Sequence, residues 1–107
     1  MKVLLDACTP RPLREFLPDH SVKTAQEMAW GELKNGDLLR EAETQFDALI
    51  TTDQNLRYQQ QLRGRKLAIL VLPTNDWPTI RSNAKAVATK VAGLKPGDFV
   101  ELSWTNP

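Results

Sequence analysis

The sequence predicts a single α/β domain with three layers, in which helices cover both faces of a mostly parallel sheet of four or five strands. The apolar runs are short and continuous, which is typical of strands buried on both faces of a sheet. Stretches with apolar residues at helical spacing lie between these runs. Strands that alternate with helices indicate a parallel sheet with right-handed crossovers. The length of 107 residues suits one domain, which we expect to span residues 1–107.

The first part of the chain is expected to hold two strands joined by a helix. Val3 to Leu5 is a continuous apolar run and predicts a buried strand. The helix that follows has Pro12 in its first turn and Pro18 at its end, and Val22 to Thr24 is expected as the second strand. The residues of this helix that we expect to pack on the sheet are Leu13, Phe16 and Leu17.

In the middle of the chain, Asn35 is predicted to cap a helix that runs from Gly36 to Gln45. The run from Asp47 to Thr52 indicates a third buried strand. A short helix or an extended loop is expected over Leu56 to Leu62, followed by a turn at residues 63–65.

The last part of the chain holds the most strand-like run, Leu67 to Leu72. Asn75 or Asp76 is expected to cap one longer helix with Pro78 in its first turn. Phe99 to Leu102 then predicts a final edge strand. The apolar face of the long helix is expected to consist of Ile80, Ala84, Val87, Ala88, Val91 and Leu94.

Composition excludes several classes of protein. Hydrophobic residues make up 41% of the chain, enough for one modest core, and the net charge of +1 excludes a strong whole-molecule field for nucleic acid or membrane. Cys8 is the single cysteine, so the chain forms no internal disulfide and no cysteine-rich zinc site. The apolar run in MKVLLDA is too short for a signal peptide or a membrane span. We expect a soluble cytoplasmic protein with no membrane partner.

Three aspartates are the candidate catalytic and metal-ligating residues. Asp6 and Asp53 follow the first and third predicted strands, and the carboxyl ends of parallel strands open into the crevice where α/β sheets bind ligands. Asp37, at a helix start, can fold back toward the same crevice. Crowded carboxylates repel one another unless a cation is bound. Oxygen ligands without histidine or cysteine favour Mg²⁺ or Mn²⁺, whose bound water can attack a phosphodiester.

Each of these residues also has a purely structural explanation. Asp37 is well placed as a helix-start residue, and Asp53 as the opener of an Asx turn. The hydroxyls of Thr51 and Thr52 could orient a metal-bound water, or these threonines could simply favour the strand. Cys8 is expected to be a buried or half-buried spectator. Taken together at strand ends, the aspartates favour a site.

Three segments resemble a known family. LLDACTPRPL, NGDLLREAE and ALITTDQNL are similar to the small PIN-like proteins of the group known as DUF5615, relatives of the VapC-like toxin ribonucleases, and the resemblance covers roughly residues 1–72. It implies a metal-dependent ribonuclease whose acids are Asp6, Asp37 and Asp53, together with a cognate antitoxin partner and a homodimer. Many relatives carry further acids where this chain has Ala7 and Asn55, which predicts a minimal one-metal site.

Basic and polar residues near the acids are the candidate substrate-binding groups. Arg11, Asn55 and Arg57 are expected to contact RNA, because cations beside the acids would neutralise the flanking phosphates. Arg14, near the start of the same helix, could take the same role or could lie on a solvated helix face.

The leading hypothesis is therefore a Mg²⁺- or Mn²⁺-dependent endoribonuclease, the toxin of a toxin–antitoxin pair. One alternative is a non-catalytic PIN-like binding module, suggested by Ala7 and Asn55. Another is a receiver-like phosphoacceptor domain with Asp53 as the acceptor. It ranks last because Ala7 and Cys8 stand where an acidic doublet would be expected.

Overall fold

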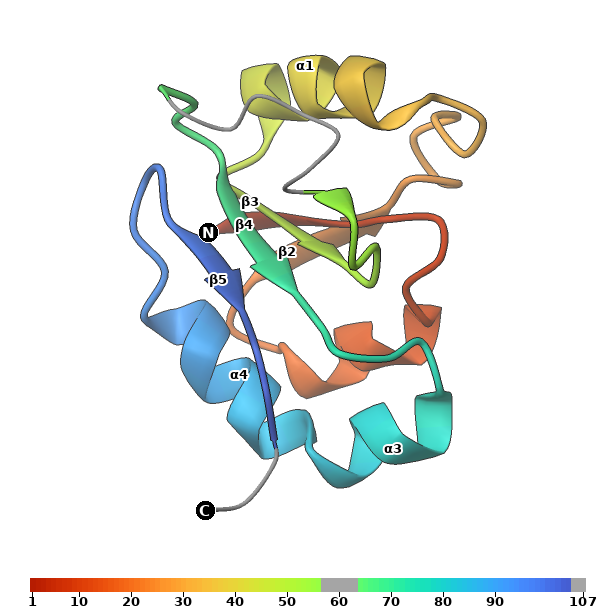
Figure 1. The fold of residues 1–107 in the computed structure, drawn as a ribbon, viewed down its shortest axis with the longest axis vertical. Coiled ribbons are helices and arrows are strands. Elements are labelled where there is room, and N and C mark those ends of the chain that lie inside the picture. The colour runs from red at the N-terminus through yellow and green to blue at the C-terminus, as the bar shows by residue number, and fades with distance from the viewer. Residues whose placement is uncertain (57–63, 105–107) are drawn as a thin grey trace.

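Five parallel strands form one sheet with the order β2-β1-β3-β4-β5, and helices lie on both of its faces (Figure 1). The computed structural model describes residues 1–56 and 64–104. The predicted α/β class is confirmed, and every strand pair in the described sheet is parallel. The strands are β1 (Lys2–Leu5), β2 (Ser21–Thr24), β3 (Ala48–Thr51), β4 (Ala68–Val71) and β5 (Phe99–Glu101). The helices are the 3₁₀ helix η1 (Arg11–Phe16) and the α-helices α1 (Asn35–Gln45), α3 (Trp77–Ser82) and α4 (Ala84–Ala92).

Alternate residues of the central strands bury opposite faces of the sheet. Leu4, Leu49 and Ile69 are paired across β1, β3 and β4 and belong to the apolar cluster under α1. Their neighbours along the strands, such as Leu5 and Ile50, pack with η1, α3 and α4 in a second cluster. Figure 1 shows α1 on one side of the sheet and the other helices on the opposite side. This two-sided burial explains the continuous apolar runs in the sequence.

The connection into β5 has the opposite hand to the two connections on either side of β2. The chain steps from β1 to β2 through η1, and from β4 to β5 in the opposite direction through α3 and α4. Because η1 and α4 contact each other on the same face, these two connections differ in hand. The connection from β2 to β3 through α1 lies on the other face and shares the hand of the first. The expectation of uniformly right-handed crossovers is therefore wrong.

A physical reason for this exception is the shortness of η1. η1 has only six residues and lies against β2 and α4. Ile50 and Leu70 on the same face are buried with the apolar side chains of α3 and α4, which include Ile80 and Val87. Covering this face with α3 and α4 removes those side chains from water, and each contributes roughly 1.5–3 kcal/mol.

The helices differ from the prediction at several points. The long helix expected before β5 is broken at Asn83, whose side-chain amide donates to the Thr79 carbonyl (2.8 Å) in place of regular helix continuation. Asp76 caps α3 as expected, with its carboxylate accepting from the backbone N–H of Thr79. Phe16 is 39% exposed rather than buried on the sheet, and its ring lies against Trp77.

Two further expectations concern the middle of the chain. α1 begins at Asn35, so Lys34 rather than Asn35 occupies the cap position. The helix or loop expected over residues 56–62, and the first residue of the turn after it, lie outside the described residues apart from Leu56, which is buried under α1.

The strand order defines where a ligand site is expected. From β1 the chain crosses one face of the sheet through η1 and forms the outer strand β2. It then crosses the opposite face through α1, and β3 pairs with the other side of β1. In an open α/β sheet, the crevice at such a reversal lies outside the carboxyl ends of the two strands. The strands before Asp6 and Asp53 are neighbours in the sheet, so both residues lie at this reversal.

Candidate functional site at the carboxyl ends of β1 and β3

Asp6 directly follows β1 and is held between β1 and β3. Its backbone N–H donates to the Ile50 carbonyl at 3.0 Å, which continues the pairing of the two strands. Its carboxylate is half-exposed. One oxygen, Oδ1, accepts from the Ala7 N–H at 2.6 Å. The other, Oδ2, accepts from the hydroxyl of Thr51 at 2.7 Å and from the thiol of Cys8 at 3.4 Å. These donors fix the orientation of the carboxylate.

Thr51 connects Asp6 with the segment that carries Asp53. It is the last residue of β3 and is only 1% exposed. Its hydroxyl donates to Asp6 and accepts from the backbone N–H of Asp53 at 3.1 Å. One hydroxyl therefore joins the ends of two adjacent strands. The role that the sequence suggested, orienting a water, would compete with these two bonds.

Asp53 is half-exposed and opens an Asx turn. Its Oδ1 accepts from the backbone N–H of Asn55 at 2.9 Å. The structural explanation that the sequence offered for Asp53 is thus realised, at the same edge of the sheet as Asp6. Asn55 itself is exposed.

Asp37 lies in the first turn of α1, with its side chain 57% exposed and its Oδ1 3.5 Å from the Arg40 guanidinium. Within residues 1–56 and 64–104 there is no group of three or more His, Cys, Asp or Glu side chains placed to hold one metal ion. The three aspartates therefore do not form such a group in this part of the chain. Thr51 links the Asp6 carboxylate to the backbone N–H of Asp53, and Asp37 takes no part in that link.

Cys8 is exposed at this edge, so the expectation of a buried or half-buried thiol is wrong. Its Sγ accepts from the Thr52 hydroxyl at 3.0 Å and donates to Asp6 Oδ2. Cys8 is not among the site residues predicted from the sequence. The signal was nevertheless present, because the strand-end rule that selects Asp6 also places a residue two positions later at the same edge.

Arg11 is the basic residue that remains available near Asp6. Its side chain is exposed and makes no ion pair or hydrogen bond with another described residue. It lines a hollow of about 280 Å³ formed by the loop after β1 and by Gln26, whose side-chain amide donates to the Ala7 carbonyl at 3.1 Å. Arg57, the other predicted basic contact, lies outside the described residues.

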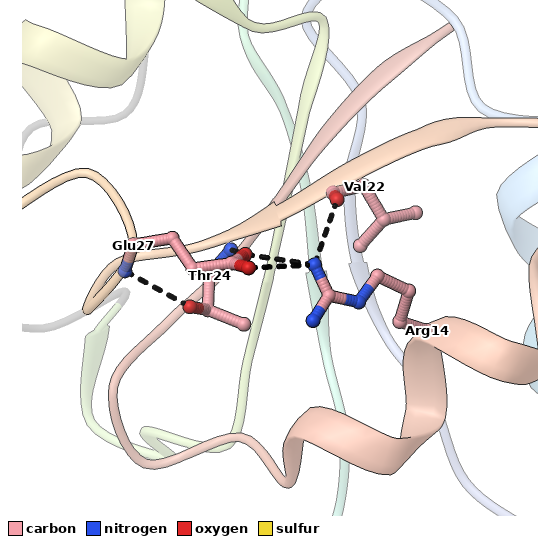
Figure 2. Close-up of polar contacts among 4 residues, drawn as sticks. All are labelled: Arg14, Val22, Thr24 and Glu27. Atoms are coloured by element: carbon pink, nitrogen blue, oxygen red, sulfur yellow. Dashed lines mark hydrogen bonds and ion pairs between the residues drawn. The ribbon is translucent and has the colours of Figure 1, made fainter.

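Arg14 makes a structural contact with Glu27 and Val22 (Figure 2). Its Nη1 lies 2.8 and 3.0 Å from the two carboxylate oxygens of Glu27 and also donates to the Val22 carbonyl. Glu27 and Thr24 exchange reciprocal bonds between side chain and backbone, as in a capping box. The Thr24 N–H and the Arg14 guanidinium lower the pKa of Glu27. This network fixes the turn after β2, so the structure favours a structural role for Arg14 over contact with a phosphate.

No helix in the described part of the chain is long and apolar enough to cross a membrane. Comparisons with protein-family models, with curated proteins and with solved structures found no match to this chain.

Proposed function

We propose that this protein is a Mg²⁺- or Mn²⁺-dependent endoribonuclease of PIN type that acts at the carboxyl ends of β1 and β3. One observation carries the proposal: two aspartates follow adjacent strands at the reversal of strand order, where the buried hydroxyl of Thr51 joins the Asp6 carboxylate to the backbone N–H of Asp53. This is the place where open α/β sheets bind their ligands.

The chemistry of the donors fits the proposed ion. Asp6 and Asp53 offer carboxylate oxygens from half-exposed side chains, and hard oxygen donors suit Mg²⁺ and Mn²⁺. Asp37 would be the third ligand. Its contact with Arg40 is an exposed pair at 3.5 Å, and such pairs contribute little free energy. Turning the Asp37 side chain away from Arg40 would therefore cost little.

The bound ion would supply a water of lowered pKa and positive charge for the developing phosphorane. The chain's own residues would hold the carboxylate ligands in place and position the RNA. Thr51 keeps the Asp6 carboxylate in one orientation. Arg11, whose side chain is exposed and has no partner among the described residues, would contact a phosphate beside the scissile bond. Asn55 and Arg57 remain candidate RNA contacts. An antitoxin partner, a homodimer and a cytoplasmic location belong to the same proposal and depend on the sequence resemblance.

A non-catalytic binding module is the second candidate, and one observation favours it. The Asp53 carboxylate already closes a turn through Asn55, and Asp37 is paired with Arg40. If these contacts persist when a cation is added, the site would bind an ion or RNA without the three-acid geometry that hydrolysis requires.

The test compares cleavage of single-stranded RNA in Mn²⁺ by the parent protein and by Asp6→Asn and Asp53→Asn. Asp19→Asn is the matched control, because Asp19 is exposed in the turn that enters β2, at the opposite edge of the sheet. We expect at least a hundredfold loss of cleavage in the two site variants and none in the control. Cleavage that is equal in all four proteins would come from a contaminant and would refute the assignment.

Calorimetry with Mn²⁺ separates the two candidate functions. Binding by the parent that both site variants lose, without cleavage of any RNA tested, would favour the binding module. Absence of Mn²⁺ binding by the folded parent would refute the metal site itself.

A further inference from the structure

β2 is an edge strand of the described sheet, where β1 is its one neighbour. In a parallel pair, the backbone groups of a strand point alternately toward its neighbour and away from it. Ser21 and Ala25 donate their N–H groups to carbonyls of residues 1–5. Val22 and Thr24, at the alternate positions, therefore direct their N–H and C=O groups to the open side. Such groups are a template for pairing with the strand of another chain.

The chain itself covers most of this open side (Figure 2). Arg14, from η1, donates through Nη1 to the Val22 carbonyl at 3.4 Å. Glu27, from the turn after β2, accepts from the Thr24 N–H at 2.9 Å, and the Thr24 carbonyl accepts from the Met28 N–H at 3.2 Å. Three of the four outward groups of Val22 and Thr24 are therefore engaged within the chain. The ion pair at 2.8 Å fastens Arg14 and Glu27 to each other, and we call these two side chains the edge cover.

A second copy of the same strand has the backbone groups that match those under the edge cover. If two β2 strands pair antiparallel about a twofold axis, Val22 of one copy lies opposite Thr24 of the other, and each such pair exchanges two hydrogen bonds. This pairing needs the Val22 carbonyl and the Thr24 N–H, which the edge cover occupies. It also places Lys23 opposite the same residue of the second copy, where like charges are unfavourable. The Lys23 side chain is exposed and forms no ion pair with residues 1–56 or 64–104.

We propose that Arg14 and Glu27 prevent β2 from pairing with β2 of a second copy, and that Lys23 opposes the same contact by its charge. Occupied backbone groups and an unpaired cation are separate features, and both act on one edge of the sheet. Without the edge cover, the sheet of one copy can continue into the sheet of another. The homodimer implied by the sequence resemblance would then have to use a different surface. The edge cover acts independently of the proposed nuclease.

The first test removes the edge cover with the double variant Arg14→Ala/Glu27→Ala. Arg81→Ala/Glu41→Ala is the control with the same change of charge, because both residues are exposed and lie on α3 and α1, away from this edge. Sedimentation velocity at several concentrations measures self-association, and circular dichroism verifies that each variant is folded. We expect at least tenfold tighter self-association of the uncovered variant than of the parent, and no such gain in the control. Parent-like association of the folded uncovered variant would overturn the proposal.

The second test locates the contact by a change of charge at Lys23. The uncovered variant is mixed with the same variant that also carries Lys23→Glu, so that opposite charges face each other in the mixed pair. We expect the mixed pair to form at least fivefold more tightly than either protein pairs with itself. Equal association in all three combinations, as aggregation through unfolded chains would give, would refute a contact at β2.

Two further measurements complete the test. Lys23→Glu with the edge cover intact, mixed with the parent, should associate no more tightly than the parent does with itself. A gain in that mixture would show that Arg14 and Glu27 do not close the edge. Should the double variant fail to fold, Glu27→Ala alone opens the Thr24 N–H and carries both tests, with an expected gain of at least threefold. Parent-like association of that variant would likewise overturn the proposal.

Discussion

Replacing Thr51 with valine tests the link between the two aspartates most directly. Valine has nearly the same shape as threonine but lacks the hydroxyl, so the change removes both hydrogen bonds of a residue that is 1% exposed. Asp6 loses a charge-assisted bond of 2.7 Å, and the Asp53 N–H loses its acceptor at 3.1 Å. No other described contact of Thr51 involves its side-chain oxygen.

The expected cost follows from these two bonds. A bond to a charged group contributes about 1.5–3 kcal/mol when buried, and a neutral one about 1 kcal/mol. Asp6 and Asp53 are half-exposed, so water replaces part of what is lost, and the added apolar group of valine offsets a little more. We therefore expect a loss of roughly 1–2 kcal/mol in the free energy of unfolding, and a melting temperature lower by roughly 5–15 °C.

Urea denaturation followed by circular dichroism measures this loss, and an unchanged m-value would show that compactness is unaltered. Thr52→Val is the control, because the half-exposed Thr52 hydroxyl donates mainly to the sulfur of Cys8, a weak acceptor. We expect the control to cost less than about 0.5 kcal/mol. Equal stability of Thr51→Val and the parent, or equal losses in both variants, would refute the bridging role assigned to Thr51.

Three further predictions concern the scaffold. The Thr24 N–H and Arg14 lower the pKa of Glu27 from its ordinary value of 4.5, so its contribution to stability is present above that value and is lost as the pH falls through the folded pKa. Glu27→Gln should therefore flatten the acid limb of a plot of unfolding free energy against pH, and an unchanged limb would contradict this. Gly97→Ala should lower the free energy of unfolding in urea more than Gly64→Ala does. Both positions have positive φ, which costs about 1–2 kcal/mol when a side chain is present. Only at Gly97 would the new Cβ also approach a backbone carbonyl, that of Arg65, at 3.3 Å. Asp76→Ala should lower the free energy of unfolding by about 1 kcal/mol, because α3 loses its N-cap. A melting temperature identical to that of the parent would argue against the cap.

The strands could be predicted almost completely, because each buried strand leaves an uninterrupted apolar run in the sequence. β1, β3 and β4 lie within one or two residues of their predicted limits. The long helix before β5 was predicted less well. Its apolar spacing continues through Asn83, and only the side-chain bond from Asn83 to the Thr79 carbonyl shows why the helix breaks there.

The candidate site was predicted in part. The strand-end rule correctly placed Asp6 and Asp53 at the carboxyl ends of parallel strands, since that position depends on strand direction alone. Only the structure showed that the two strands are neighbours. Apolar patterning carries no information on which donors reach a carboxylate. The engagement of the Thr51 hydroxyl, the exposure of Cys8 and the pairing of Arg14 with Glu27 all depend on side chains from separate segments meeting in space.

By itself, the sequence determined the α/β class and the edge of the sheet where its acids lie, because both follow from local apolar periodicity and from the direction of parallel strands. The tertiary structure alone decided how the acids are held. Thr51 and Asp6 are 45 positions apart, and their contact exists only because β1 and β3 are neighbours in the sheet. The hand of the connection into β5 was likewise decided by which face of the sheet remained to be covered, a property of the packed chain and not of any one segment.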